Sequence, residues 1–284
     1  MHLRDENSPA LSQSGYSPLW PTKYDLLGVD VSATTYTDAA NVILTAAKRH
    51  RGGLVTALAV HGVVEASTDA DYNAVIKDYD MVTPDGQPVR MALNSLHGAK
   101  LASRVAGPDL MLLVCERAAA EGVSIYLYGS TDQVVTTLRD RLIEKFPELK
   151  VAGCEPSLFR PITPEESQQL ADRINTSGAG VVFIGLGCPL QEKFSHQHRD
   201  LFNAVQFCVG AAFDFHAGTK RRAPHWMREI GMEWFYRMMQ EPRRLCKRYI
   251  TTNAMFIAKF VQQWIRQPDN MAEDLEPTAD RAVP

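Results

Sequence analysis

The sequence predicts an α/β fold: a Rossmann-like three-layer αβα domain around a mostly parallel sheet, followed by a helical, arginine-rich appendage. Short runs rich in β-branched and aromatic residues alternate with helical patterns up to about residue 213. This alternation is typical of βαβ units, in which helices cover both faces of a parallel sheet. After residue 216 the pattern changes to helical stretches in which arginines and aromatic residues are interleaved.

The strands and helices are expected in alternation along the chain. Strands are expected at residues 54–60, 79–84, 123–129, 151–153, 180–187 and 204–213, and helices at about 38–50, 88–96, 108–121, 132–145, 164–177 and 189–202. Thr163, followed by a proline and two glutamates, has the residues of a helix N-terminus. Ligands of such sheets bind where the strands end, so the turns at these ends are the expected positions of functional residues.

Length and composition suit one large domain with an appendage. The chain has 284 residues, 45% of them hydrophobic, which is enough to bury a core without disulfides. We expect a disordered tail over 1–22, the core over 23–216, the basic helical appendage over 217–266 and a disordered acidic tail over 267–284. Five scattered cysteines indicate reduced thiols in the cytosol. No stretch reaches the ~18 apolar residues of a membrane span, so neither export nor spanning is expected.

Charge is unevenly distributed. The net charge is only −3, but residues 217–250 contain nine Lys or Arg and three Glu, a local charge of +6. This imbalance predicts an anionic partner for the appendage. An ordinary solvated helical face is the alternative interpretation.

The turn after the expected strand at 79–84 contains a candidate general base. Asp85 lies in the run Thr-Pro-Asp-Gly-Gln-Pro, where two prolines and a glycine restrict the backbone. A carboxylate held rigidly at the carboxyl end of a strand could accept a proton from a substrate. A capping aspartate in a Pro-Asp-Gly turn explains the same residues, and the local sequence leaves both interpretations open.

Two further turns could bind phosphate. Gly185 and Gly187 precede Gln191 and Glu192, so backbone amides and polar side chains could meet an anion at a helix N-terminus. Gly129, after the strand expected at 123–129, begins a similar but generic turn. The Gly185 turn lacks the third glycine of a dinucleotide-binding motif. Cys188 has no histidine near it in sequence, which favours a packing role over a nucleophile.

Metal binding is not expected. The pairs Asp69/Asp71 and Asp78/Asp80 have the Asp-x-Asp spacing of some metal-binding carboxylates, but both precede a strand instead of ending one. The histidines are scattered without the spacing of metal ligands.

Taken together, these motifs resemble those of the WecB/TagA/CpsF family of bacterial glycosyltransferases. The matching stretches, from about Leu26 to Tyr249, are VTPDGQPV (82–89), SRVAGPDL (103–110), IYLYGS (125–130), FIGLGCPLQE (183–192), VGAAFDFHAG (209–218), RAPHWM (222–227) and GMEWFYRMMQEPRRLCKRY (231–249). The resemblance implies an inverting, metal-independent transfer of N-acetylmannosamine, N-acetylmannosaminuronic acid or glucose. The donor would be a UDP-sugar, and the acceptor a polyprenyl-diphosphate-linked glycan in the synthesis of cell-surface polysaccharides.

The resemblance also assigns roles to residues. Asp85 is expected to be the catalytic base, with Arg104 positioning a substrate beside it. Donor binding is expected at Thr56, Gly129, Gly185, Gly187, Gln191 and Glu192. Acceptor phosphate and membrane contacts are expected at Arg222, Arg237, Arg243, Arg244 and Arg248. The protein is then expected in the cytoplasm, peripheral at the inner face of the plasma membrane, with an anionic membrane surface as a partner. Homo-oligomer formation is left open by the sequence.

Two departures from the family pattern bear on the substrates. Leu58 stands where many members have an asparagine, and Leu190 replaces a common lysine. The rival hypotheses are an epimerase or dehydrogenase acting on a nucleotide sugar, which would need the dinucleotide motif, and a non-catalytic scaffold that binds nucleotide sugars at the membrane. Nucleic-acid binding is not expected, because the whole chain is acidic and contains no recognisable nucleic-acid module.

Overall fold

The computed structural model describes residues 20–266, so the tails expected at both ends fall almost entirely outside it. The strands are β1 Lys23–Leu26, β2 Val29–Ser32, β3 Leu54–Leu58, β4 Met81–Pro84, β5 Ile125–Gly129, β6 Val151–Glu155, β7 Val181–Gly185 and β8 Val205–Cys208. The helices are α1 Tyr36–Lys48, α2 Val60–Ala66, α3 Ala70–Lys77, α4 Gln87–His97, α5 Gly107–Glu121, α6 Asp132–Lys145, α7 Pro164–Thr176, α8 Leu190–Gln197, α9 Ala212–Ala217, α10 His225–Glu229, α11 Glu233–Gln240 and α12 Pro242–Arg266.

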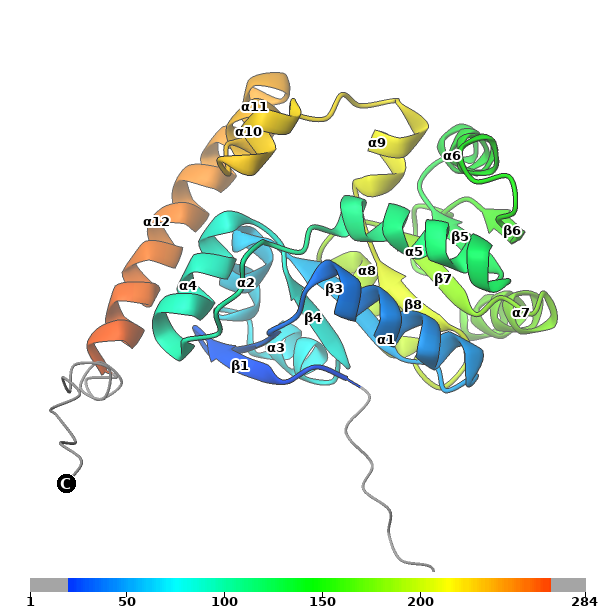
Figure 1. Cartoon of the computed structure of the whole chain (residues 1–284), viewed down its shortest axis with the longest axis horizontal. Coiled ribbons are helices and arrows are strands. Elements are labelled where there is room, and N and C mark those ends of the chain that lie inside the picture. Colours follow the sequence, from blue (N-terminus) through cyan, green and yellow to red (C-terminus); the bar gives the residue numbers. More distant parts are fainter. Residues whose placement is uncertain (1–19, 267–284) are drawn as a thin grey trace, which may run out of the picture.

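The main sheet confirms the predicted fold class. Its six strands run in the order β4-β3-β8-β7-β5-β6, and every neighbouring pair is parallel (Figure 1). All carboxyl ends therefore lie along one edge of the sheet. β1 and β2 form a separate antiparallel hairpin whose turn, at Leu27 and Gly28, has positive φ at both residues.

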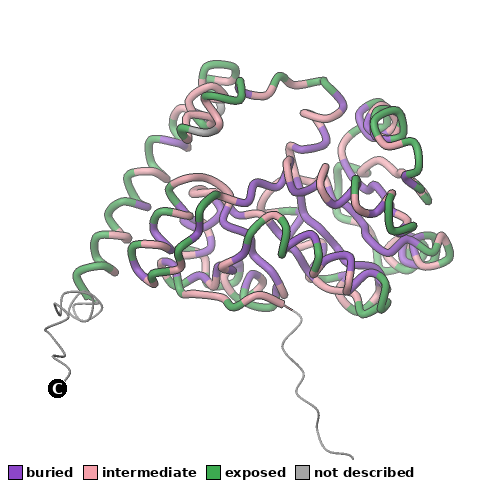
Figure 2. The backbone as a smooth tube through the Cα atoms, in the orientation of Figure 1, coloured by how far each residue is buried: buried purple, intermediate pink, exposed green. Residues whose placement is uncertain are grey.

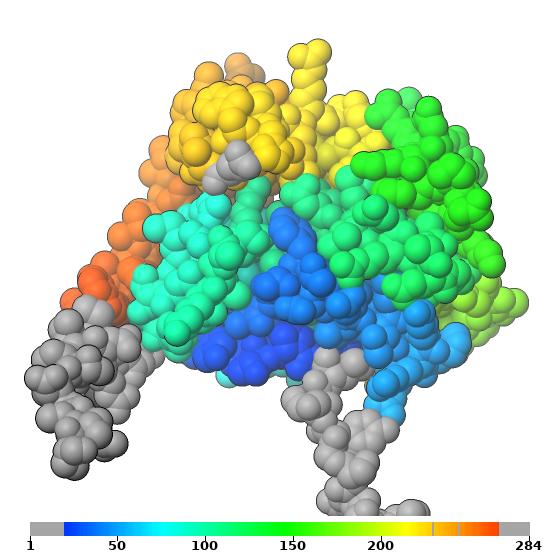
Figure 3. Space-filling model, viewed as in Figure 1, coloured from blue at the N-terminus to red at the C-terminus, as the bar shows by residue number. Residues whose placement is uncertain are grey.

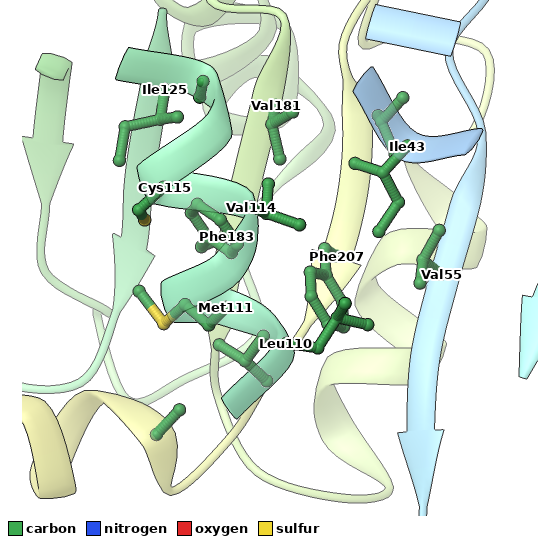
Figure 4. Packing of buried hydrophobic residues seen from close by; sticks show 14 of the residues in the cluster. Ile43, Val55, Leu110, Met111, Val114, Cys115, Ile125, Val181, Phe183 and Phe207 are labelled. Atoms are coloured by element: carbon green, nitrogen blue, oxygen red, sulfur yellow. The ribbon is translucent and has the colours of Figure 1, made fainter. Parts of the chain in front are cut away.

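Helices cover both faces of the sheet and produce the three layers. Successive side chains of a strand point to opposite faces, and in β7 Phe183 packs with α1, α5, α6 and α9 while Ile184 packs with the helices of the other face. Figure 4 shows the first of these layers, where Leu110 lies next to Phe207 and Ile43 belongs to the same cluster. Both faces are largely apolar along the strands, as is typical of buried parallel sheets, and Thr56, Thr83 and Gln206 are buried polar exceptions.

The secondary structure differs from the prediction in several places. The strands expected at 54–60 and 204–213 are shorter, because their last residues begin α2 and α9, and the helix expected at 189–202 ends at Gln197. The hairpin β1–β2 and the helices α2 and α3 were not expected; these elements are short, so periodicity does not reveal them. At α7 the prediction is confirmed, since Thr163 and Glu166 form a reciprocal capping box.

The appendage consists of α10, α11 and the long α12, which runs along one side of the domain (Figure 1). The far end of α12 is fastened to the hairpin, where Gln263 accepts a hydrogen bond from the Leu27 amide and donates one to Asp25. Lys259 donates to the carbonyl of Ser67 after α2. Most of the outer side of α12 is exposed (Figure 2). Within residues 20–266, no helix has both the length and the apolar composition to cross a bilayer.

Candidate active site

A cavity of about 1070 Å³ lies at the carboxyl edge of the sheet. The ends of β3, β4, β5, β7 and β8 form its floor, and α11 and α12 of the appendage form its opposite wall. In Figure 3 the appendage stands above the core, joined to it by the segment that follows α9. The volume is large enough for a drug-sized or larger ligand, and its walls combine apolar side chains with a few charged ones.

Asp85 lies in the cavity where the sequence analysis placed it. It follows β4 directly, and its backbone amide donates a hydrogen bond to the carbonyl of Leu58 at the end of β3. Gly86, with φ of +103°, turns the chain into α4. The preceding residues are also held in place: the Thr83 hydroxyl donates a hydrogen bond to the Val105 carbonyl, and the Val105 amide donates one to the Pro84 carbonyl. The carboxylate is thus held by a rigid turn, as expected.

The surroundings of Asp85 suit a proton acceptor. Its side chain is 23% exposed, and burial raises the pKa of the carboxyl to about 6 despite the opposing effect of Arg104. The Glu233 carboxylate raises this pKa further, whereas Arg222 and the amide of Gly107 lower it. A base with this pKa is largely ionised at pH 7 and still binds a proton more strongly than an ordinary aspartate.

Arg104 joins the core to the appendage. One of its terminal nitrogens, Nη2, donates to Oε2 of Glu233 at 2.7 Å, and Nη1 lies 4.0 Å from Oδ1 of Asp85. Glu233 also lies 3.4 Å from Nε of Arg222, which forms a two-pronged ion pair with Asp109 at 2.6 and 2.7 Å. These charged groups come from four separate segments and meet beside the Asp85 turn.

The turn after β7 is arranged differently from the Asp85 turn. Gln191 lines the cavity, but its Oε1 accepts the amide hydrogen of Gly187 and its Nε2 donates to Glu192. Glu192 is fully buried and also accepts a hydrogen bond from the Thr56 hydroxyl at 2.8 Å. Thr56 and Glu192 therefore lie behind the cavity wall, where they orient Gln191. Direct contact of these two residues with a donor stays a prediction.

The glycines of the β5 and β7 turns allow two backbones to approach closely. A Cβ atom on Gly129 would lie 2.7 Å from the backbone of Gly185, and Gly129 has φ of +126°. Gly129 does not line the cavity, whereas Gly185, Gly187 and Ser130 do. Gly129 thus shapes the turn instead of presenting its own amide to the cavity.

Cationic side chains of the appendage face the cavity. Arg237 and Arg248 line it, and Nε of Arg248 is buried without a hydrogen-bond partner in the described part of the chain. His61, in the first turn of α2, lines the same cavity. Burial, together with Arg248 and Arg237, lowers the pKa of its imidazole to about 4. The imidazole is therefore neutral at pH 7, and this part of the cavity suits an anion.

The other three arginines assigned to phosphate or membrane lie elsewhere. Arg222 does not line the cavity, because its guanidinium is bound to Asp109 and Glu233. Arg243 is exposed near the start of α12. The backbone of Arg244 continues α12, but its side chain lies outside the described part of the structure.

Both Asp-x-Asp pairs serve local structure away from the cavity. Asp69 caps α3, and Asp80 binds the Leu54 amide and Arg199 at the opposite edge of the sheet. Among residues 20–266, no three His, Cys, Asp or Glu side chains are grouped closely enough to hold a metal ion.

The two departures from the family pattern have different positions. Leu58 is 1% exposed and packs in the core, so its side chain does not line the cavity, although the neighbouring Ala57 and Ala59 do. Leu190 is 66% exposed at the start of α8 and lies on the cavity rim.

Sequence reasoning missed Glu233 and His61 as cavity residues. Glu233 was counted only in the charge of the appendage, and its partner Arg104 is 129 positions away. No local spacing reveals such a contact. His61 follows β3 directly, so the rule that ligands bind at the ends of parallel strands could have found it.

Comparisons with known proteins show which sequences this chain is similar to. The model of the glycosyl transferase WecG/TagA/CpsF family matches residues 24–270. An N-acetylglucosaminyldiphosphoundecaprenol N-acetyl-beta-D-mannosaminyltransferase of Bacillus spizizenii strain W23 is 33% identical over 181 residues, which are 63% of this chain and 68% of that protein. The enzyme of the same name from Bacillus subtilis strain 168 is 34% identical over 180 residues, with the same shares.

Proposed function

Because the chain belongs to the WecG/TagA/CpsF family of glycosyl transferases, we propose that it moves an N-acetylhexosamine from a UDP-sugar to a polyprenyl-diphosphate-linked sugar. The product would serve the synthesis of a cell-surface polysaccharide. The names of the two relatives support N-acetylmannosamine as the transferred sugar and a lipid-linked N-acetylglucosamine as the acceptor. Many members have an asparagine where this chain has Leu58. The Leu58 side chain is buried, and only Ala57 and Ala59 line the cavity at this point, so a different N-acetylhexosamine or hexose is the alternative donor.

The observation that carries the proposal is the position and acidity of Asp85. Its carboxylate faces a large cavity from the end of a strand, and its pKa of about 6 suits a general base. In the proposed reaction an acceptor hydroxyl attacks the anomeric carbon while Asp85 takes its proton. The bond from this carbon to the diphosphate oxygen breaks, and the electron pair leaves with UDP. A single displacement of this kind inverts the anomeric configuration.

The departing diphosphate needs stabilisation as its negative charge grows. Arg237 and Arg248 line the cavity, and the unpartnered Nε of Arg248 could donate to a phosphate oxygen. The planar guanidinium matches phosphate oxygens well. We therefore propose that these side chains act where a metal ion serves in other transferases, and that transfer continues in EDTA.

The test is product analysis with a panel of UDP-sugars and a synthetic prenyl-diphosphate N-acetylglucosamine. Mass spectrometry identifies the transferred sugar, and NMR of the new linkage gives the anomeric configuration. We expect one N-acetylhexosamine to be transferred with inversion, in the presence of EDTA. Retention of configuration, or hydrolysis of the donor without transfer, would contradict the proposal. Restoration of EDTA-treated enzyme by magnesium or manganese would contradict the role of the arginines.

The appendage also has the features of a surface that rests on a membrane. Large apolar side chains of α10–α12 are exposed: Trp226, Ile230, Met239, Ile250, Ile257, Val261, Trp264 and Ile265. On α12 they recur at helical spacing opposite the buried Leu245, Tyr249 and Phe256. We propose that this face lies in the interface of an anionic leaflet, with Arg243 beside it, on the cytoplasmic side of the plasma membrane.

Vesicle binding tests this part separately. Arg243→Glu should weaken binding to vesicles containing anionic lipid about thirtyfold at low salt, because each basic residue near such a surface contributes about 1 kcal/mol and the change removes one and adds a repulsive charge. Lys150→Glu is the matched control, because Lys150 is an exposed residue of the αβα domain directly before β6, at the amino edge of the sheet. Equal binding of both variants would leave α12 as an ordinary surface helix.

A further inference from the structure

We propose that Glu233 of the appendage is a positioning residue for the transfer: its carboxylate holds the Arg104 guanidinium off Asp85, so that the docked appendage keeps the base free to accept a proton. This inference rests on the proposed role of Asp85 as the base. It gives the appendage a chemical task in the core that is separate from contact with substrate phosphates or with a membrane.

The distances show which carboxylate Arg104 binds. Its Nη2 lies 2.7 Å from Glu233 Oε2, the distance of a charge-assisted hydrogen bond. Its Nη1 lies 4.0 Å from Asp85 Oδ1, which is beyond a hydrogen bond. The side chains of Arg104 and Glu233 are only 11% and 15% exposed, so water competes little with their pairing. Arg104 is thus bound by the appendage and only near the base.

The appendage has its own attachment beside this pair. Arg222, in the segment leading to α10, binds Asp109 of α5 through two hydrogen bonds, and Arg228 of α10 lies 3.3 Å from the same carboxylate. To this attachment through Asp109, Glu233 adds only a 3.4 Å contact with Nε of Arg222. Loss of the Glu233 charge should therefore leave the appendage docked, while Arg104 loses its strongest partner.

Several charged or polar groups act on Asp85 from the elements packed around it. They are Arg104 before α5, the Gly107 amide in α5, Tyr36 in α1, Arg222 before α10, and Glu233 in α11. The two arginines favour the ionised carboxylate of Asp85, and Glu233 disfavours it. With Glu233 neutralised, Arg104 could close the remaining gap and pair directly with Asp85. Such a pair lowers the pKa of a carboxyl, typically by 1–3 units, and weakens it as a base.

The experiment compares pH–rate profiles of kcat/KM for four proteins: wild type, Glu233→Gln, Arg104→Gln and the control Glu241→Gln. We expect Glu233→Gln to move the acid limb about one pH unit lower and to reduce the plateau rate about tenfold. Arg104→Gln should move the limb in the opposite direction, to higher pH, because the cation beside Asp85 is lost. Glu241, on the same appendage, lies near Lys220 and not near Arg104, so its variant should keep the wild-type profile.

Opposite displacements of the acid limb separate this inference from general damage, since a loosened fold would not produce them. The double variant, with both Arg104→Gln and Glu233→Gln, should then have nearly the profile of Arg104→Gln alone, because Glu233 acts through Arg104. Glu233→Asp, which keeps the charge, should keep the limb near its wild-type position even if it is less stable. An unmoved limb in a folded Glu233→Gln protein would overturn the inference and leave the base assignment intact. If Asp85→Asn turns over normally, the base assignment itself fails.

Discussion

Asp85 and Glu192 are two carboxylates held by turns at the same edge of the sheet, and their surroundings differ. Asp85 follows β4, is 23% exposed and lies beside two guanidinium groups. Glu192 follows β7, is fully buried and accepts hydrogen bonds from Thr56 and Gln191. Burial raises the pKa of both carboxyls. Only Asp85 opens onto the cavity.

The difference shows that a place at the carboxyl edge does not by itself assign a catalytic role. A base must reach the substrate, and a nearby cation must keep it ionised at working pH. Glu192 lacks both features and instead fixes the amide of Gln191, which in turn accepts the Gly187 amide hydrogen. In the proposed function, Asp85 therefore carries the chemistry, and Glu192 supports the turn that follows β7.

The largest expected effect comes from Asp85→Asn. The amide keeps the shape of the side chain but cannot accept a proton at neutral pH, so turnover should fall about 10²- to 10⁴-fold while the affinity for UDP-sugar changes little. Turnover and donor binding are measured side by side. A folded variant with near-normal turnover would return the Pro-Asp-Gly turn to a purely structural role.

Thermal melts of the same variant provide a check that does not depend on catalysis. The pKa of Asp85 is raised from 3.8 to about 6 on folding, so the folded state binds more protons between these values and the free energy of unfolding falls as pH rises through them. Above pH 6 the ionised carboxylate costs stability. Asp85→Asn should therefore melt higher than the wild type at pH 8, by an amount equivalent to about 3 kcal/mol, and the gain should disappear near pH 4.

The pH dependence of the wild-type enzyme tests the same group. Because Asp85 must be unprotonated to act, kcat/KM should fall tenfold per pH unit below about pH 6 and level off above it. His61, whose pKa is lowered to about 4, should not contribute to this limb. A limb centred near the usual aspartate pKa of about 4 would show that Asp85 is not perturbed in solution.

A smaller effect is expected for Glu192→Gln. Burial raises the pKa of Glu192, and among the described residues no cation is one of the groups that shift it. The side-chain amide of the introduced glutamine can replace the hydrogen bonds of the protonated carboxyl. Turnover should fall less than about tenfold, with most of the change in donor KM, because Gln191 loses part of its support. Steady-state kinetics decide the matter. A loss as large as that of Asp85→Asn would make Glu192 a second catalytic candidate and remove the contrast.

The smallest effect is expected for Cys188→Ala. Cys188 lines the cavity in the β7 turn, and burial raises the pKa of its thiol well above the usual range, so no thiolate is available at neutral pH. Its Sγ lies 3.3 Å from the Tyr72 hydroxyl. Turnover should stay within about twofold of wild type. Intact-protein mass spectrometry that detects a sugar bound to Cys188 would contradict this and indicate a covalent route.

Most of the sheet could be predicted because its strands are apolar on both faces and alternate with helices. The runs around Val181 and Ile125 are continuous hydrophobic segments, and each is bounded by glycine. The order of the strands could not be predicted, because β8 inserts between β3 and β7 through side-chain packing that the sequence pattern does not contain. The hairpin β1–β2 was missed since Lys23–Leu26 has just one fully buried residue.

The site was predictable where one turn contains all the information. The prolines and glycine around Asp85 restrict its backbone locally, and the structure places it in the cavity as expected. Thr56 and Glu192 were assigned to the donor site by resemblance; their side chains are buried behind the cavity wall, and their contact with a donor stays a prediction. Arg222 binds Asp109 instead of lining the cavity, because that carboxylate lies across from it in the folded chain and nowhere near it in sequence.

The place of β8 in the sheet has a consequence for folding during synthesis. β3 pairs with β4 on one side and with β8 on the other, and Leu54 of β3 lies opposite Gln206 of β8. Until the ribosome has released β8, the β3–β4 pair and the β5–β6–β7 group cannot join, and β3 and β7 each present an unpaired edge. Contacts between such distant segments also form slowly. The nascent chain should therefore depend on chaperones until its last strand is made.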